Sequence, residues 1–118
     1  MALRRLLPIL LAVVATSASA TSTMCTYNPG DRTGYGLEFI GYAEIAMILV
    51  SLPKGPRSLP GGSYKVLEFD ERASKIDLVY RNPGDPRLPP SFRLQGAGRK
   101  VLMSIGEKQI VGELNCDY

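Results

Sequence analysis

The sequence predicts a small all-β domain: an antiparallel β-barrel or β-sandwich of about six to seven strands, with its ends joined by one disulfide. Two observations support this prediction. Short runs of alternating apolar and polar residues are separated by Gly- and Pro-rich turn segments at intervals of about eight to twelve residues. Two cysteines, Cys25 and Cys116, lie near the two ends of the body of the chain. The pattern does not separate a barrel from a sandwich.

Residues 1–20 have the order of a secretory signal peptide: two arginines, an apolar run, and Ser-Ala-Ser-Ala ending at Ala20. We expect cleavage after Ala20, which leaves 21–118 as a single all-β domain that is periplasmic or secreted. The apolar run is too short to span a membrane, and no later stretch is long enough. Met24 is too large for the position before a lipidated cysteine, so we expect no lipid anchor.

Removal of this segment changes the charge balance. The chain has 14 basic and 11 acidic side chains, and two of the basic ones, Arg4 and Arg5, lie in the signal segment. Twelve basic side chains then face 11 acidic ones, a net charge of +1. Such a balance gives nucleic acid or an anionic membrane no electrostatic reason to bind.

The longest apolar stretch, Tyr35–Leu52, is predicted to be one strand, bent near Gly41, where a missing side chain permits a kink. Residues 45–50 are apolar at odd and even positions alike, so we expect them in the middle of the sheet and covered on both faces, with 43–50 as the central element of the domain. A helix is the alternative, because several of these residues are good helix formers, but Gly41 and the β-branched residues favour a strand.

The remaining elements follow in order. The polar segment 26–36 contains Asn-Pro-Gly-Asp at 28–31, which predicts a type II turn, and the same tetrapeptide returns at 82–85; we interpret the pair as one turn used twice. The Pro-rich segments 53–62 and 82–90 are predicted to be loops without regular structure. The expected strands are 64–69 and 75–80, forming a hairpin, and then 92–95, 100–105 and 108–115, forming a meander with turns at 96–98 and at Gly106-Glu107. The positions expected to face inward are Phe39, Ile45, Met47, Leu78, Tyr80, Met103 and Ile110.

The two cysteines predict a disulfide, because an exported chain with an even number of cysteines forms one readily. Cys116 is in phase with the inward residues Ile110 and Leu114, so its sulfur is expected to point toward Cys25. Joining the first and last segments would help to close a barrel and so remove its edges. A zinc site is disfavoured, because the chain has no His and only two Cys.

The chain has few side chains that are suited to catalysis. Without His, the chain lacks the commonest general base and the usual nucleophile pairs, and no nucleophile elbow or phosphate loop is present. The carboxylates Glu68, Asp70 and Glu71 are interpreted as a solvated turn, and the absence of Trp disfavours a sugar cleft. We expect no enzyme activity, no cofactor and no metal.

The remaining hypothesis is protein binding. The loops 53–62 and 82–90 are stiffened by proline, and Lys54, Arg57 and Arg87 are the candidate binding residues, with the arginines able to pair with carboxylates of a partner. In size, export signal and terminal cysteines the chain is similar to small exported bacterial β proteins that inhibit envelope-acting enzymes, such as lysozyme inhibitors. This resemblance implies an inhibitor or immunity-type partner and carries no site residue over. The alternative is a carrier that holds a small apolar ligand inside a barrel.

Overall fold

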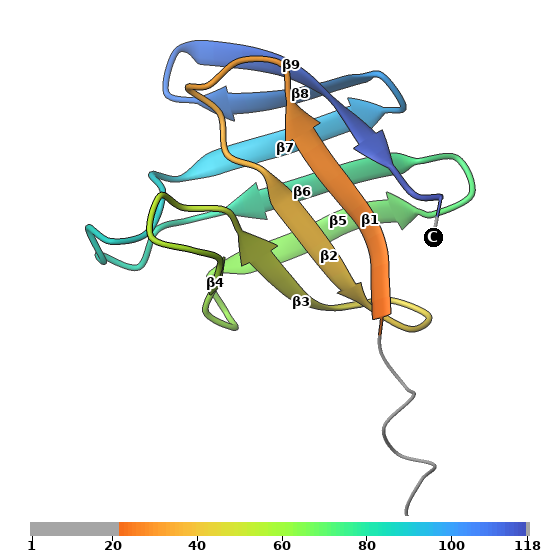
Figure 1. The fold of residues 1–118 in the computed structure, drawn as a ribbon, viewed down its shortest axis with the longest axis horizontal. Coiled ribbons are helices and arrows are strands. Elements are labelled where there is room, and N and C mark those ends of the chain that lie inside the picture. Colours follow the sequence, from red (N-terminus) through yellow and green to blue (C-terminus); the bar gives the residue numbers. More distant parts are fainter. Residues whose placement is uncertain (1–21, 118) are drawn as a thin grey trace, which may run out of the picture.

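The computed structural model describes residues 22–117, which form one continuous antiparallel sheet of nine strands, curled into a half-barrel (Figure 1). The predicted signal peptide lies outside the described residues. Across the sheet the strand order is β4-β3-β2-β1-β9-β8-β7-β6-β5. The strands are β1 (Ser22–Pro29), β2 (Leu37–Gly41), β3 (Ile45–Val50), β4 (Arg57–Ser58), β5 (Tyr64–Asp70), β6 (Lys75–Tyr80), β7 (Phe92–Ala97), β8 (Lys100–Ile105) and β9 (Lys108–Asn115).

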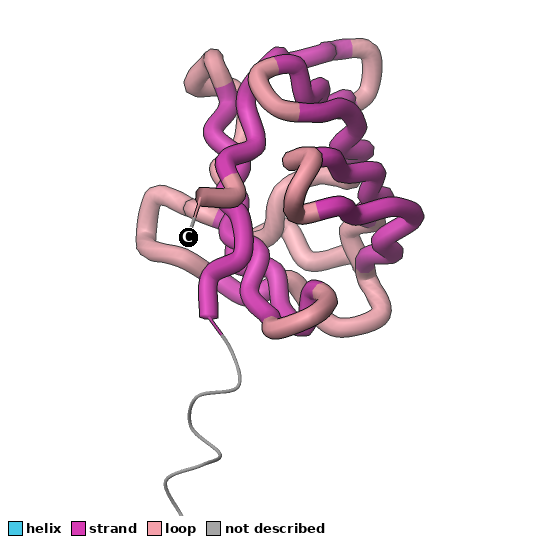
Figure 2. The backbone as a smooth tube through the Cα atoms, turned by 90° about the vertical axis from the view of Figure 1, so that its right-hand side faces the viewer, coloured by secondary structure: helices cyan, strands magenta, loops and turns pink. Residues whose placement is uncertain are grey.

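The all-β prediction is confirmed, and the described part of the chain has strands and loops but no helix (Figure 2). It therefore holds no helix long and apolar enough to cross a membrane. The predicted hairpin and the C-terminal meander are found as β5–β6 and β7–β9. The strand count is higher than expected for two reasons: β1 and β4 were assigned to loops, and one predicted strand is two.

Strand β1 was missed because it begins and ends in polar residues. It lies in the middle of the sheet, between β2 and β9. Its alternation is carried by Cys25 and Tyr27, both fully buried. The Tyr27 hydroxyl donates a hydrogen bond to the Ile110 carbonyl oxygen at 3.2 Å, which satisfies the one polar group that this side chain brings into the core.

The prediction of a single strand over Tyr35–Leu52 is wrong, because the chain reverses direction after Gly41. Strands β2 and β3 pair antiparallel as a hairpin, and their register shifts at Gly41. A Cβ atom at Gly41 would lie only 2.0 Å from the Glu44 carbonyl oxygen, so this tight reversal requires glycine. The turn itself, 42–44, contains none of the usual turn residues, and this is why the sequence pattern concealed it.

The expectation that 45–50 lies in the middle of the sheet and is covered on both faces is also wrong. Only the two-residue strand β4 lies beyond β3, which places β3 near an edge. Ile48 and Val50 face inward with no exposed area, whereas Met47 faces outward and is 41% exposed. The reversal after Gly41 resets the alternation, so that the even positions Ile48 and Val50 face the core.

Five of the seven positions expected to face inward are confirmed as buried: Phe39, Leu78, Tyr80, Met103 and Ile110. Ile45 is half-buried against the core, and Met47 is the error just described.

The disulfide between Cys25 and Cys116 is present, and it joins residues 91 positions apart. Cys25 lies in β1, and Cys116 directly follows β9. Because β1 and β9 are neighbours in the middle of the sheet, the bond fastens the centre of the sheet and does not join its edges, which are β4 and β5. The expectation that the bond helps to close a barrel is therefore wrong.

The two Asn-Pro-Gly-Asp segments adopt different conformations, so the idea of one turn used twice is wrong. At 82–85 the predicted turn forms, and Gly84 has a φ of 98°. At 28–31 the Asn and Pro continue β1, and the Gly30 N–H donates to the Val111 carbonyl oxygen of β9 at 2.9 Å. The chain turns only afterwards, at 31–34.

Candidate functional site

The three candidate residues lie together. Lys54, Arg57 and Arg87 come from two loops that are distant in sequence, yet all three line one pocket of about 380 Å³ at one end of the half-barrel. We call this pocket the cationic pocket. All three side chains are exposed, and the rest of its wall is mainly apolar: Leu52, Pro53, Gly55 and Pro56.

The loop that carries Arg87 is organised by the side chain of Asn82. The Asn82 amide donates to the carbonyl oxygens of Asp85 (2.8 Å) and Pro89 (2.9 Å). Its own oxygen accepts from the backbone N–H groups of Gly84 (2.6 Å) and Asp85 (2.7 Å). Four hydrogen bonds from one side chain give this irregular segment a defined shape, so ordering it on binding costs little free energy.

Arg87 is held by an internal ion pair. Its Nε and Nη2 atoms lie 3.1 and 3.2 Å from the two carboxylate oxygens of Asp85, and its backbone N–H donates to the same carboxylate at 2.9 Å. These hydrogen bonds from Arg87 lower the pKa of Asp85, and the charge of Arg57 lowers it slightly further. Two of the guanidinium nitrogens are therefore already hydrogen-bonded to Asp85. Arg87 can form a bidentate contact with a partner's carboxylate through these nitrogens only if its ion pair with Asp85 opens.

The loop 53–62 is more regular than predicted. Arg57 lies in β4 and pairs with Val50 of β3. Further along, Leu59 is buried and its N–H donates to the Ile48 carbonyl oxygen at 2.9 Å. Lys54 lies on the preceding turn, which is closed by a hydrogen bond of 2.9 Å from the Gly55 N–H to the Leu52 carbonyl oxygen. Both cations are thus presented by an anchored segment.

A second pocket, of about 460 Å³, adjoins the cationic pocket and shares Leu52, Pro53 and Arg87 with it. It adds Arg32 and Tyr35, which are not among the binding residues predicted from the sequence. Arg32 has a signal in the sequence, because an arginine closely follows each copy of the repeated tetrapeptide, Arg32 after the first and Arg87 after the second.

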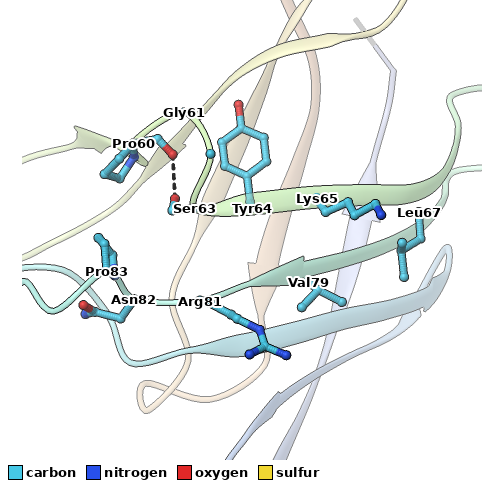
Figure 3. Close-up of a pocket in the computed structure, with 11 residues that line it drawn as sticks. Pro60, Gly61, Ser63, Tyr64, Lys65, Leu67, Val79, Arg81, Asn82 and Pro83 are labelled. Atoms are coloured by element: carbon cyan, nitrogen blue, oxygen red, sulfur yellow. Dashed lines mark hydrogen bonds between the residues drawn. The ribbon is translucent and has the colours of Figure 1, made fainter.

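A larger open groove, of about 650 Å³, lies elsewhere, on the outer side of the β5–β6 hairpin (Figure 3). Leu67 and Val79 supply apolar surface there, and Lys65 and Arg81 lie beside them. Leu67 is 50% exposed, which is unusual for a residue in a strand of this hairpin. This groove was not predicted from the sequence; among its lining residues, Leu67 lies at the register shift of β5.

Two of the carboxylates in the described residues lie in ion pairs on the surface of the sheet. Glu68 forms an ion pair with Lys75 at 3.3 Å, and Asp77 forms one with Arg93 at 2.9 Å, both on the outer surface of the sheet. Within 22–117, no three His, Cys, Asp or Glu side chains are grouped as a metal site would require.

Comparison with protein-family models, curated proteins and solved structures returns no match.

Proposed function

We propose that this chain is an exported, non-catalytic interaction protein that binds another protein at the cationic pocket, for example as an inhibitor or immunity-type partner of an envelope-acting enzyme. The observation that carries this proposal is the meeting of Lys54, Arg57 and Arg87 around one pocket. Lys54 and Arg57, with Arg87 beside them in its ion pair with Asp85, attract an anionic group of a partner, and the mature chain offers no general charge excess that would explain binding elsewhere.

The pocket favours an acidic side chain beside an apolar one. Its walls of proline and leucine suit an apolar contact, and the cations stand at the same opening. Arg57 is the expected anchor for a carboxylate, because Arg87 is held by Asp85. Arginine at the centre of an interface commonly contributes more than its neighbours to the binding free energy. Both loops are already shaped by internal hydrogen bonds, which reduces the entropy lost on binding.

Affinity capture with a matched control tests the proposal. The protein is immobilised and exposed to a periplasmic or secreted extract, and partners captured by the wild type are compared with those captured by Lys54→Ala/Arg57→Ala. The control is Arg99→Ala/Lys100→Ala, which removes two exposed cations in and next to the β7–β8 turn. We expect the first double variant to bind the captured partner at least tenfold more weakly, and the control to bind it like the wild type.

Equal capture by all three proteins would place the binding surface elsewhere. If no protein is captured and an apolar ligand co-purifies instead, the carrier hypothesis replaces this one. The filled interior argues against a carrier, because the inward residues Phe39, Leu78 and Met103 are completely buried against one another and their neighbours.

A further inference from the structure

Strand β5 has one edge with no neighbouring strand. It pairs only with β6 and ends the sheet on that side. The Arg81 N–H donates to the Ser63 carbonyl oxygen at 2.8 Å, so the backbone of Ser63 points toward β6. Because the direction alternates along a strand, the N–H and C=O groups of Tyr64 and Val66 point the other way, to the open edge. An edge of this kind is a template for another strand.

A bulge in β5 changes which residues share a face. The pairing with β6 shifts register between Val66 and Glu68, so Leu67 is an extra residue without a cross-strand partner. Beyond the bulge the alternation is reset. The residues packed on the core side are Tyr64, Val66 and Phe69, and those on the outer side are Lys65, Glu68 and Asp70.

We propose that a second copy of this chain pairs with β5, edge to edge and antiparallel, about a two-fold axis at Val66. In this register Tyr64 lies opposite Phe69 of the second copy, and Lys65 lies opposite its Glu68. Directly opposite residues must share a face, and these pairs do so only because of the bulge. The strand is thus complementary to itself, as an isologous interface requires.

The charges on this surface agree with the proposal. On the outer side of the hairpin and of β7, the cations Lys75 and Arg93 have ion pairs with carboxylates of the same chain, whereas Lys65 and Arg81, which line the groove, have none within the described residues. Glu68 is about half exposed, so its carboxylate can accept Lys65 of the second copy while it keeps Lys75. Each dimer would gain two such pairs, related by the two-fold axis.

The proposed pairing also accounts for the exposed Leu67 and for the groove on the β5–β6 hairpin. In the proposed register, Leu67 of the second copy lies beside Lys65, over the groove of about 650 Å³ where Lys65, Leu67 and Val79 lie along the hairpin (Figure 3). Pairing would bury apolar surface that the single chain leaves in water. A bulge and a central lysine normally keep an edge from pairing with arbitrary strands. Here the same features select a strand with a matching bulge and a matching carboxylate.

Charge reversal tests this interface. Sedimentation velocity on the oxidised protein should give the mass of a dimer, which dissociates on dilution and at high salt. Lys65→Glu places two carboxylates opposite each other at each pair, and Glu68→Lys does the same with two cations. We expect each variant alone to dissociate at least about tenfold more readily than the wild type. A mixture of the two variants should form a heterodimer, because every pair is then complementary.

The control is Lys100→Glu, which makes the same change of charge on β8, away from the edge. It should dimerise like the wild type. Circular dichroism and thermal unfolding of each variant confirm that it is folded before sedimentation. A wild type that stays monomeric at about 100 μM, or a Lys65→Glu variant that dimerises as well as the control, overturns the proposal. Failure of the two single variants to associate when mixed also contradicts this register.

Discussion

The hairpin of β2 and β3 makes a sharp prediction about two adjacent residues. Ile48 faces the core with no exposed area, and Met47 faces outward with 41% of its surface exposed. A continuous central strand would bury both. In the observed fold, Ile48→Ala should destabilise the protein strongly, and Met47→Ala only weakly.

The magnitude follows from burial. Ile→Ala removes three carbon groups, each worth about 0.8 kcal/mol of transfer free energy, and the cavity left behind adds to this. We therefore expect Ile48→Ala to lower the free energy of unfolding by about 2–5 kcal/mol. Met47 packs on one side only, so Met47→Ala should cost about 1 kcal/mol or less. For a domain whose total stability is on the order of 5–15 kcal/mol, the first change is readily measured.

Urea unfolding followed by circular dichroism gives both values. Aspartate at the same two positions increases the contrast: Ile48→Asp should prevent folding, because its carboxylate would be buried without a partner, while Met47→Asp should fold. Similar losses for the two alanine variants, or a folded Ile48→Asp protein, would refute the assignment of faces in β3.

Three further predictions concern the bonds that hold the sheet and its loops. The native protein should show a mass two hydrogens below that of the reduced form, and Cys116→Ser should lower the free energy of unfolding by about 2–5 kcal/mol; two alkylatable thiols in the native protein would contradict the bond. Burial raises the pKa of Tyr27 from its ordinary value of 10.0 to about 12, so the hydroxyl proton is held more tightly in the folded state. The stability that the protonated Tyr27 hydroxyl contributes is complete below pH 10 and is lost as the pH rises from 10 toward 12, by about 3 kcal/mol. Tyr27→Phe should remove this part of the alkaline loss of stability. Tyr42→Phe, at an 80% exposed site, should not remove it. Asn82→Ala should cost about 1–3 kcal/mol and increase amide exchange in the loop that carries Arg87, and unchanged exchange would mean that the proline residues alone hold its shape.

The sequence predicted most readily those strands whose alternation is uninterrupted. Strand β6 and the meander of β7 to β9 have apolar residues or glycine at every second position facing the core, with conventional turns between the strands. Strand β5 was also predicted, although its bulge at Leu67 breaks the alternation, because most of its residues are β-branched, aromatic or apolar. Strand β1 was not predicted, because its fully buried residues are a cysteine and a tyrosine among mostly polar neighbours. Its position also depends on pairing with β2 and β9, and β9 is distant in sequence. Local pattern carries little information about such a strand.

The candidate site was predicted in part. Composition and proline content singled out Lys54, Arg57 and Arg87, and the fold brings these three side chains to one pocket. The sequence did not indicate that Asp85 holds Arg87, because a short ion pair within a loop depends on backbone angles that residue types do not specify. The groove on β5 was not predicted for a similar reason. Leu67, which lines it, lies at a bulge, and a bulge is a property of the pairing of two strands.

The repeated tetrapeptide shows how the surroundings decide between conformations of one sequence. The first copy continues β1, because the Gly30 N–H finds an acceptor on β9. The second copy has no strand beside it, and Asn82 bonds to its own loop instead. The arginine that follows each copy nevertheless reaches the same end of the half-barrel, where Arg32 and Arg87 line one pocket of about 460 Å³. Arg32 therefore lies beside the cationic pocket, in the adjoining pocket that shares Leu52, Pro53 and Arg87 with it.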